Sequence, residues 1–138
     1  DAHVIPALIH QCYLSKKENK KFIIKGTGKP KRQFIYSTDL AKLILLVIEK
    51  YNISQSIIMS PPEKDEVSIG NIGLLIANKF NYQNMIEYDT TYSDGQYKKT
   101  VSSKRVEELF PNFKFTSLEE GLNETIEWFL EKYPNVRK

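Results

Sequence analysis

A cluster of basic residues around two glycines is the strongest candidate in this sequence for a chemical role. Its members are Lys25, Lys29, Lys31 and Arg32, with Gly26-Thr27-Gly28 between the first two. Arginine offers a planar, bidentate donor to phosphate oxygens, and lysine offers a point charge. The cluster therefore predicts a clamp for a diphosphate group. The same residues are also typical of a solvated basic turn, and their types and spacing leave both interpretations open.

A second polar loop, with Asp94-Gly95 followed by Lys98-Lys99, has a similar composition. Its simplest interpretation is a surface turn, because aspartate and glycine are favoured in such turns. On the residues alone, the two loops indicate an anion-binding domain and nothing narrower.

Two other spacings resemble cofactor motifs, and we interpret both as coincidences. The pair Gly26-x-Gly28 does not form a dinucleotide fingerprint, because Lys31 occupies the third glycine position and a strand is predicted to follow. No helix N-terminus would then face a pyrophosphate. Tyr13 and Lys17 have the spacing of the Tyr-x-x-x-Lys pair of many reductases. Common residue types often fall four positions apart by chance, and no Rossmann strand precedes this pair.

His3 is the residue best suited to proton transfer, because histidine titrates near neutral pH without much tuning. A lone histidine is nevertheless more often a surface or packed residue than a catalyst. His10 lies seven residues later, roughly on the same helix face, but without carboxylates nearby the two do not make a metal site. The single cysteine, Cys12, excludes an internal disulfide and a cysteine-based zinc site. We therefore expect no metal.

The composition favours a folded domain. The 138 residues are 41% hydrophobic and 12% aromatic, which is too apolar for intrinsic disorder. The net charge of +3 is weak for a nucleic-acid binder.

The longest apolar run, residues 43–48, is far below the ~18 residues of a membrane span, and the amino terminus is not a signal peptide. One cysteine suits a reducing compartment, so we expect a cytoplasmic protein. The chain lacks an initiator methionine, so we expect it to begin mid-protein.

The hydrophobic pattern predicts one mixed α/β unit over residues 1–138, in the order α β β α β α β α α. The first expected helix begins at residue 4. Four more helices are expected over residues 37–51, 68–80, 103–109 and 117–133. The expected strands are residues 22–24, 33–36, 56–60 and 85–88. Glycines between the first two strands predict a hairpin over 22–36 with a basic tip.

Local signals specify some of these elements further. Pro6 suits the first turn of the opening helix, since a missing N–H does no harm there. Ser37 or Thr38, Ser68 and Ser117 are expected N-caps, the last in a Ser-x-x-Glu capping box with Glu120. The apolar spacing in helix 37–51 predicts one buried face. That face would contain Leu40, Leu43, Ile44, Val47, Ile48 and Tyr51.

Three stretches taken together resemble one family of enzymes. They are residues 1–10, 25–41 and 89–99. Within the second, Arg-Gln-Phe-Ile-Tyr-Ser-x-Asp-Leu-Ala resembles the extended short-chain dehydrogenase/reductases that act on sugar nucleotides. The His-Val-Ile-Pro-Ala-Leu helix and the Ser-Asp-Gly-Gln-x-Lys-Lys loop are similar to the GDP-L-fucose synthase family, the GDP-4-keto-6-deoxy-D-mannose 3,5-epimerase/4-reductases. The likeness continues to the final helix with Trp128-Phe129.

The resemblance implies an enzyme of two domains, of which this chain is one. In the family, an amino-terminal Rossmann domain binds NADP(H) and a smaller carboxy-terminal domain binds the GDP-sugar. The chain resembles the carboxy-terminal substrate-binding domain of such an extended Rossmann-type reductase. The glycine-rich loop, the Ser and Tyr-x-x-x-Lys group and the epimerisation cysteine would lie outside it. Cys12 does not replace that cysteine, since it lies inside the helix that follows His3.

The resemblance also implies roles for individual residues. His3 matches the family's acid/base histidine, which also contacts the NADP cofactor. In the family's reaction a base removes the protons at C3 and C5 of the 4-keto sugar, an acid returns them on the opposite face, and NADPH reduces the ketone. Arg32 matches a substrate-binding arginine, Lys99 a lysine near the GDP phosphates and Asp94 a substrate-contacting acid.

Two substrate-binding positions depart from the family pattern. Gln11 stands where some members carry an arginine, which removes one charge toward the diphosphate. Lys25 stands where some carry a tryptophan, which exchanges ring stacking for a cation. Both departures affect the detail of nucleotide contact rather than the substrate class.

The expected partner is a GDP-sugar, with no nucleic acid and no membrane. The parent enzyme is expected to be a homodimer, and this chain a monomer without reductase activity, since the family dimerises mainly through the other domain. One alternative is another extended-family epimerase or reductase acting on a uridine or thymidine diphosphate sugar. A second is a phosphate- or nucleic-acid-binding module based on the lysines of residues 16–32, although no aromatic stripe of the RNA-binding kind accompanies them.

Overall fold

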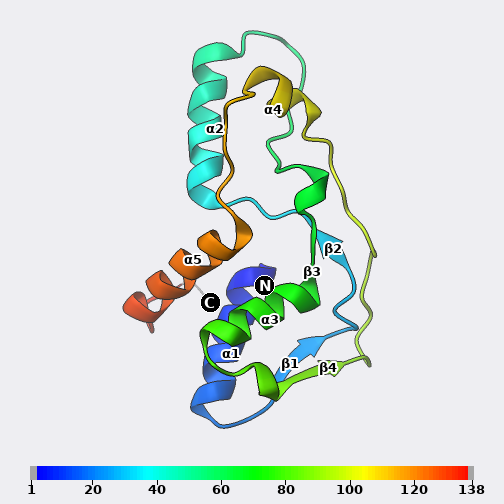
Figure 1. Cartoon of the computed structure of the whole chain (residues 1–138), viewed down its shortest axis with the longest axis vertical. Coiled ribbons are helices and arrows are strands. Elements are labelled where there is room, and N and C mark those ends of the chain that lie inside the picture. The colour runs from blue at the N-terminus through cyan, green and yellow to red at the C-terminus, as the bar shows by residue number, and fades with distance from the viewer. Residues whose placement is uncertain (1–2, 137–138) are drawn as a thin grey trace.

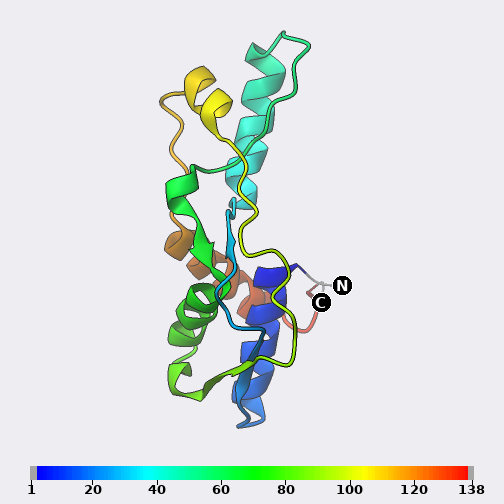
Figure 2. The ribbon, with the colours of Figure 1, turned by 90° about the vertical axis from the view of Figure 1, so that its right-hand side faces the viewer.

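The structure, a computed structural model, describes residues 3–136 of the chain. The molecule is elongated, with α2 and α4 at one end and α1, α3, β1 and β4 toward the other (Figures 1 and 2). The element order is the predicted one. The elements are α1 (Val4–Lys17), β1 (Phe22–Lys25), β2 (Lys31–Arg32), α2 (Ser37–Lys50), β3 (Val67–Ser68), α3 (Ile69–Lys79), β4 (Ile86–Asp89), α4 (Lys104–Leu109) and α5 (Leu118–Lys132), with short 3₁₀ helices at Glu63–Asp65 and Gln83–Met85.

The strands form two separate two-stranded sheets. β1 runs parallel to β4, with Lys25 opposite Asp89 at the end of the register. β2 runs antiparallel to β3, with Arg32 opposite Val67. The predicted hairpin over 22–36 is therefore wrong, because its two strands pair with other parts of the chain. The turn between them folds onto α3 instead, where Gly70 N donates a hydrogen bond of 2.8 Å to the Gly28 carbonyl.

Two predicted strands also lie elsewhere. Residues 33–36 are not a strand, and β2 comprises only Lys31 and Arg32. Residues 56–60 form no strand either, although Ile57 and Met59 pack inward while Ile58 is 50% exposed. Burial alternates along this segment, but within residues 3–136 no other strand pairs with it. The third strand is instead the short β3.

The expected N-caps of α3 and α5 are confirmed, but the N-cap of α2 is Tyr36, without a side-chain bond, rather than Ser37 or Thr38. The Ser68 hydroxyl accepts a hydrogen bond from Asn71 N, and the Ser117 hydroxyl accepts one from Glu120 N, both at 3.2 Å. Each bond satisfies a backbone N–H that a helix start otherwise leaves without a partner. α3 and α5 therefore begin where the serines indicated, and Pro6 lies in the first turn of α1.

The predicted buried face of α2 is only partly correct. Leu43 is fully buried and Val47 is half-buried. Ile44 and Ile48 are 41% and 72% exposed, respectively. The apolar face of α2 is thus wider than the part that α4 and the neighbouring loops cover.

The core is divided between the two ends of the molecule. The larger cluster joins α1, β1, α3 and α5 through buried residues such as Cys12, Phe22, Ile76 and Phe129. The smaller cluster contains Leu43, Val106 and Phe110. The segment after β4 runs along the molecule between the two ends and leads into α4 (Figure 1). It passes β2 on the way, since Lys31 and Lys98 form a parallel bridge.

Candidate functional site

Two loops that are distant in the sequence meet at one edge of the β1–β4 sheet. Because β1 and β4 are parallel, the glycine loop after Lys25 and the polar loop after Asp89 leave from the same edge. Thr27 joins them, donating from its backbone N at 2.7 Å and from its Oγ1 at 2.6 Å to the carboxylate of Asp94. Lys31 N adds a bond of 2.8 Å to the Tyr97 carbonyl. The two basic loops identified separately in the sequence thus form one surface.

Arg32 is held in place on this surface. One terminal nitrogen of its guanidinium donates to the Lys31 carbonyl at 2.6 Å, and the other donates to the Gln96 carbonyl at 2.9 Å. A guanidinium carries more N–H donors than these two bonds use. The side chain is therefore fixed and still has donors for an anion, as a phosphate-binding arginine requires.

Asp94 has a structural role at the junction of the loops. Its hydrogen bonds from the Thr27 hydroxyl and backbone lower the pKa of the Asp94 carboxyl, and the nearby Lys29 lowers it further. A methyl group at Gly26 would lie 2.3 Å from Asp94 Oδ1, so glycine at this position allows the loops to approach. The contact of Asp94 with a substrate, which the family resemblance implies, stays a prediction.

The other predicted lysines lie on the same two loops. Lys25 Nζ lies 4.5 Å from the centre of the Tyr92 ring, a cation–π contact that again joins the loops. Lys99 is exposed on the segment that passes β2. Gln11 is used differently, since its Nε2 donates to the Ile23 carbonyl at 2.8 Å and so fixes α1 to β1. It does not line the cleft described next.

His3 and Arg32 line the same cleft, which has a volume of about 520 Å³. Its walls are the start of α1, the connection from β2 to α2, and the start of α5. Tyr36 is one of the polar groups of this cleft, and its hydroxyl donates to Glu124 at 2.7 Å. This bond is the main reason that the pKa of Tyr36 is raised. His3 is exposed immediately before α1, where its imidazole can exchange protons with a molecule in the cleft.

Cys12, Tyr13 and Gly28, which the sequence does not assign to a cofactor or catalytic site, have structural roles. Cys12 is fully buried, and its burial raises the pKa of the thiol to about 12, so it is a poor nucleophile. The Tyr13 ring packs on Phe129 and Tyr133 in the core. The Gly28 backbone packs on α3, and a methyl group there would lie 2.5 Å from the Tyr88 ring. Among residues 3–136, no group of acidic, histidine or cysteine side chains could hold a metal ion, nor is any helix long and apolar enough to cross a membrane.

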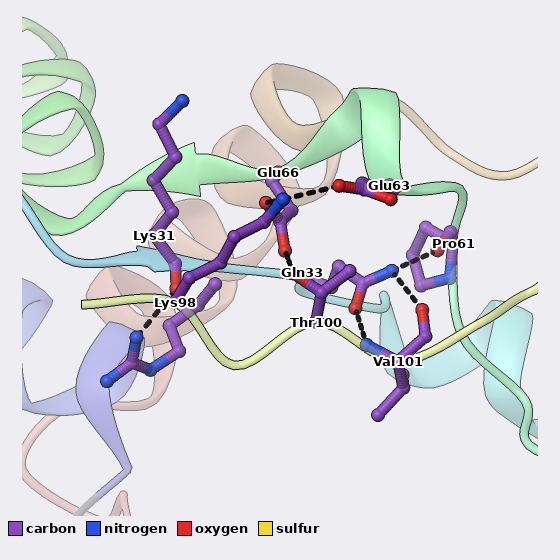
Figure 3. Close-up of polar contacts among 9 residues, drawn as sticks. Lys31, Gln33, Pro61, Glu63, Glu66, Lys98, Thr100 and Val101 are labelled. Atoms are coloured by element: carbon purple, nitrogen blue, oxygen red, sulfur yellow. Dashed lines mark hydrogen bonds and ion pairs between the residues drawn. The ribbon is translucent and has the colours of Figure 1, made fainter. Parts of the chain in front are cut away.

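Sequence reasoning missed the residues that join the loops. Thr27 was considered only as the spacer between two glycines, and Gln33 only as part of a family motif. Gln33 makes three hydrogen bonds to the backbone of other segments (Figure 3). A polar residue between Arg32 and the apolar pair Phe34-Ile35 was the available signal, but its partners are 28 and 68 residues away in the sequence.

Comparisons with known proteins agree with the resemblance found in the sequence. Residues 1–60 match the model of the NAD dependent epimerase/dehydratase family. GDP-L-fucose synthase of Dictyostelium discoideum is 42% identical over the whole chain, which covers 43% of that protein. A probable GDP-L-fucose synthase of Drosophila melanogaster is 39% identical over 99% of the chain and 45% of that protein.

Solved structures extend the comparison to the fold. The crystal structure of a GDP-L-fucose synthetase from Naegleria fowleri bound to NADP matches with a TM-score of 0.96 and 40% identity, over 99% of this chain and 41% of that one. The chain spans less than half the length of these relatives. Over its whole length the chain is therefore similar to part of GDP-L-fucose synthase, and its residues 1–60 match the NAD dependent epimerase/dehydratase family.

Proposed function

We propose that this chain is the GDP-sugar-binding domain of an NADPH-dependent epimerase/reductase that converts GDP-4-dehydro-6-deoxy-D-mannose to GDP-L-fucose. The observation that carries the proposal is the fixed guanidinium of Arg32, which lines the same cleft as His3. The similarity to GDP-L-fucose synthases over the whole chain supports the choice of substrate. By this proposal the chain is the carboxy-terminal part of a longer enzyme.

The two joined loops bind the diphosphate. Arg32 offers paired donors to phosphate oxygens, and the exposed Lys99 adds a positive charge from the neighbouring segment. Lys25 lies at the base of the same loops beside Tyr92. Asp94 would repel a phosphate, so it contributes by holding the loops together and by accepting hydrogen bonds from sugar hydroxyls. Gln11 acts indirectly, through its bond to β1.

His3 moves the protons of the epimerisation. Imidazole is a common general acid and base in enzymes, so His3 can return a proton to the enolate that forms when C3 or C5 of the 4-keto sugar is deprotonated. Its exposed position at the cleft leaves the imidazole accessible to the sugar.

The NADPH cofactor supplies the hydride that reduces the 4-keto group. Residues 3–136 do not form a dinucleotide-binding loop, because Gly26 and Gly28 lie between two strands and Gly28 packs against α3. By the family resemblance, a Rossmann domain outside this chain would bind most of the cofactor. From this chain, His3 would contact it, as the family resemblance implies, and the isolated chain should not oxidise NADPH.

Calorimetry of the isolated chain with three nucleotides tests the proposed substrate class. We expect GDP to bind more tightly than UDP or TDP. Tighter binding of UDP or TDP would instead favour another sugar-nucleotide enzyme of the extended family. Strong, salt-dependent binding of single-stranded RNA would favour the nucleic-acid module. A folded chain that binds none of these ligands contradicts the proposal.

A further inference from the structure

The side-chain amide of Gln33 holds two distant segments of backbone. Its Nε2 donates to the Pro61 carbonyl at 2.8 Å and to the Val101 carbonyl at 3.1 Å. Its Oε1 accepts from Val101 N at 2.8 Å. The amide lies between these segments, and all three bonds can be followed in Figure 3. Gln33, the residue after β2, therefore joins the end of β2 to the segment that carries Lys99.

The chemistry of the three partners requires an amide. Two of them are carbonyl oxygens that need donors, and the third is an N–H that needs an acceptor. A carboxylate provides acceptors only, and an aliphatic side chain provides neither kind of group. Gln33 thus satisfies all three backbone groups with one side chain, and an isosteric apolar residue would leave all three without this partner.

The segment held by Gln33 is anchored on its other side by acidic residues. Lys98 forms ion pairs with Glu63 and, at 3.5 Å, with Glu66. The Thr100 hydroxyl donates to the same Glu66, whose side chain is only 5% exposed. Lys98 and Thr100 therefore both face Glu66 (Figure 3). Lys99, between these two anchored residues, is exposed.

The register of the bridge places Lys99 beside Arg32. Lys31 pairs with Lys98 in parallel, so the next residues along each segment, Arg32 and Lys99, are neighbours. Arg32 and Lys99 thus lie on adjacent segments, and the Gln33 bonds to Val101 lie immediately beyond them in the chain.

We infer that Gln33 is a positioning residue for the diphosphate clamp: it keeps the segment with Lys99 against β2, so that Lys99 and Arg32 contact the same diphosphate. The inference rests on the proposed function, because it assumes that these cations bind GDP. Gln33 itself need not touch the ligand, and its effect is transmitted through the backbone at Val101.

A double-mutant cycle on the whole 138-residue chain tests this inference, with GDP and guanosine as ligands in calorimetry. Gln33→Met keeps the length of the side chain and removes its three bonds. We expect it to weaken GDP binding by about tenfold, as is typical for coupled neighbours, and to leave guanosine binding unchanged. In a Lys99→Ala background, Gln33→Met should have less than about a twofold effect on GDP binding, since the lysine that it positions is absent. Gln55→Ala, which removes an exposed amide side chain far from the loops, is the matched control.

Amide hydrogen exchange at Val101 gives a readout that is independent of any ligand. Exchange should accelerate in Gln33→Met, and to a smaller extent in Gln33→Asn, which keeps the amide but is one methylene shorter and serves if the first variant does not fold. Unchanged exchange at Val101, or full additivity with Lys99→Ala, overturns the inference while the proposed function stands. If the folded parent chain binds no GDP, the proposed function is overturned, and the inference with it.

Discussion

Asp39 and Thr116, which are 77 residues apart, form a buried contact between α2 and the entrance to α5. The carboxylate of Asp39 accepts from Thr116 N at 2.6 Å and from its hydroxyl at 3.0 Å, and Asp39 is only 1% exposed. Thr116 immediately precedes the Ser117 cap, and both residues line the cleft of His3 and Arg32. One wall of the cleft therefore depends on this contact.

Removing this carboxylate should destabilise the fold. Asp39→Ala leaves the backbone N–H of Thr116 without its charged acceptor, which costs about 2 kcal/mol or more in the free energy of unfolding. Urea denaturation at pH 7 measures the change. Asp65→Ala removes an exposed aspartate and should stay within roughly 0.5 kcal/mol of the parent. Equal effects of the two substitutions would mean that the buried contact contributes nothing.

Gly28 and Gly95 provide a matched pair for the packing of the glycine loop. Both have positive φ, +71° and +67°, so alanine is strained at either position by about 1–2 kcal/mol. Only at Gly28 would the new methyl group also collide, 2.5 Å from the Tyr88 ring and 3.1 Å from Gly70 Cα, whereas Gly95 has open space. Gly28→Ala should therefore lower the midpoint of urea unfolding clearly more than Gly95→Ala. Similar midpoints would contradict the close packing of this loop on α3.

The contact between Thr27 and Asp94 should make stability depend on pH in the acid range. Its hydrogen bonds lower the pKa of Asp94 from the ordinary value of 3.8. The contact is therefore fully formed above pH 3.8, and its contribution is lost as the pH falls through the lower folded-state value. We expect Asp94→Asn to be less stable than the parent at pH 7, and the stabilities of the two to converge only as the pH falls below 3.8. The measurement is urea unfolding of both chains from pH 7 downward, and a gap that stays constant would contradict the assignment.

The helices and the caps of α3 and α5 could be predicted from the sequence, because the signals are local. Ser68 and Ser117 lie within three residues of the backbone groups that they cap. The strand pairings could not, because Phe22 pairs with Ile86 and Lys31 with Ser68 and Lys98. Nothing in the local pattern distinguishes these long-range partners from the hairpin that the glycines suggested.

The candidate site shows the same division between local and long-range information. The basic cluster and His3 were identified by residue type and by resemblance. The Arg32 side chain is fixed in part by its hydrogen bond to the Gln96 carbonyl, which is 64 residues away in the sequence. Nothing near Arg32 in the sequence indicates this bond. The roles of Thr27 and Gln33 likewise depend on partners that only the folded chain brings close.

Arg32 also provides the sharpest test of the diphosphate clamp. Hydrogen bonds to charged groups contribute roughly 1.5–3 kcal/mol, so Arg32→Ala should weaken GDP binding by about 10–150-fold. Arg32→Lys should recover only part of this loss, because an ammonium group lacks the planar fork of the guanidinium. Lys42→Ala, which removes an exposed charge on α2, controls for the change in net charge and should leave GDP binding unchanged.

The ligand series separates the phosphate contact from recognition of the base. Binding of guanosine, which has no phosphates, should respond little to Arg32→Ala, and circular dichroism should show the variant to be folded. Calorimetry with GDP and guanosine on the parent chain and the three variants completes the measurement. If folded Arg32→Ala binds GDP as tightly as the parent, the guanidinium does not contact the diphosphate, and the basic loop is only a solvated turn.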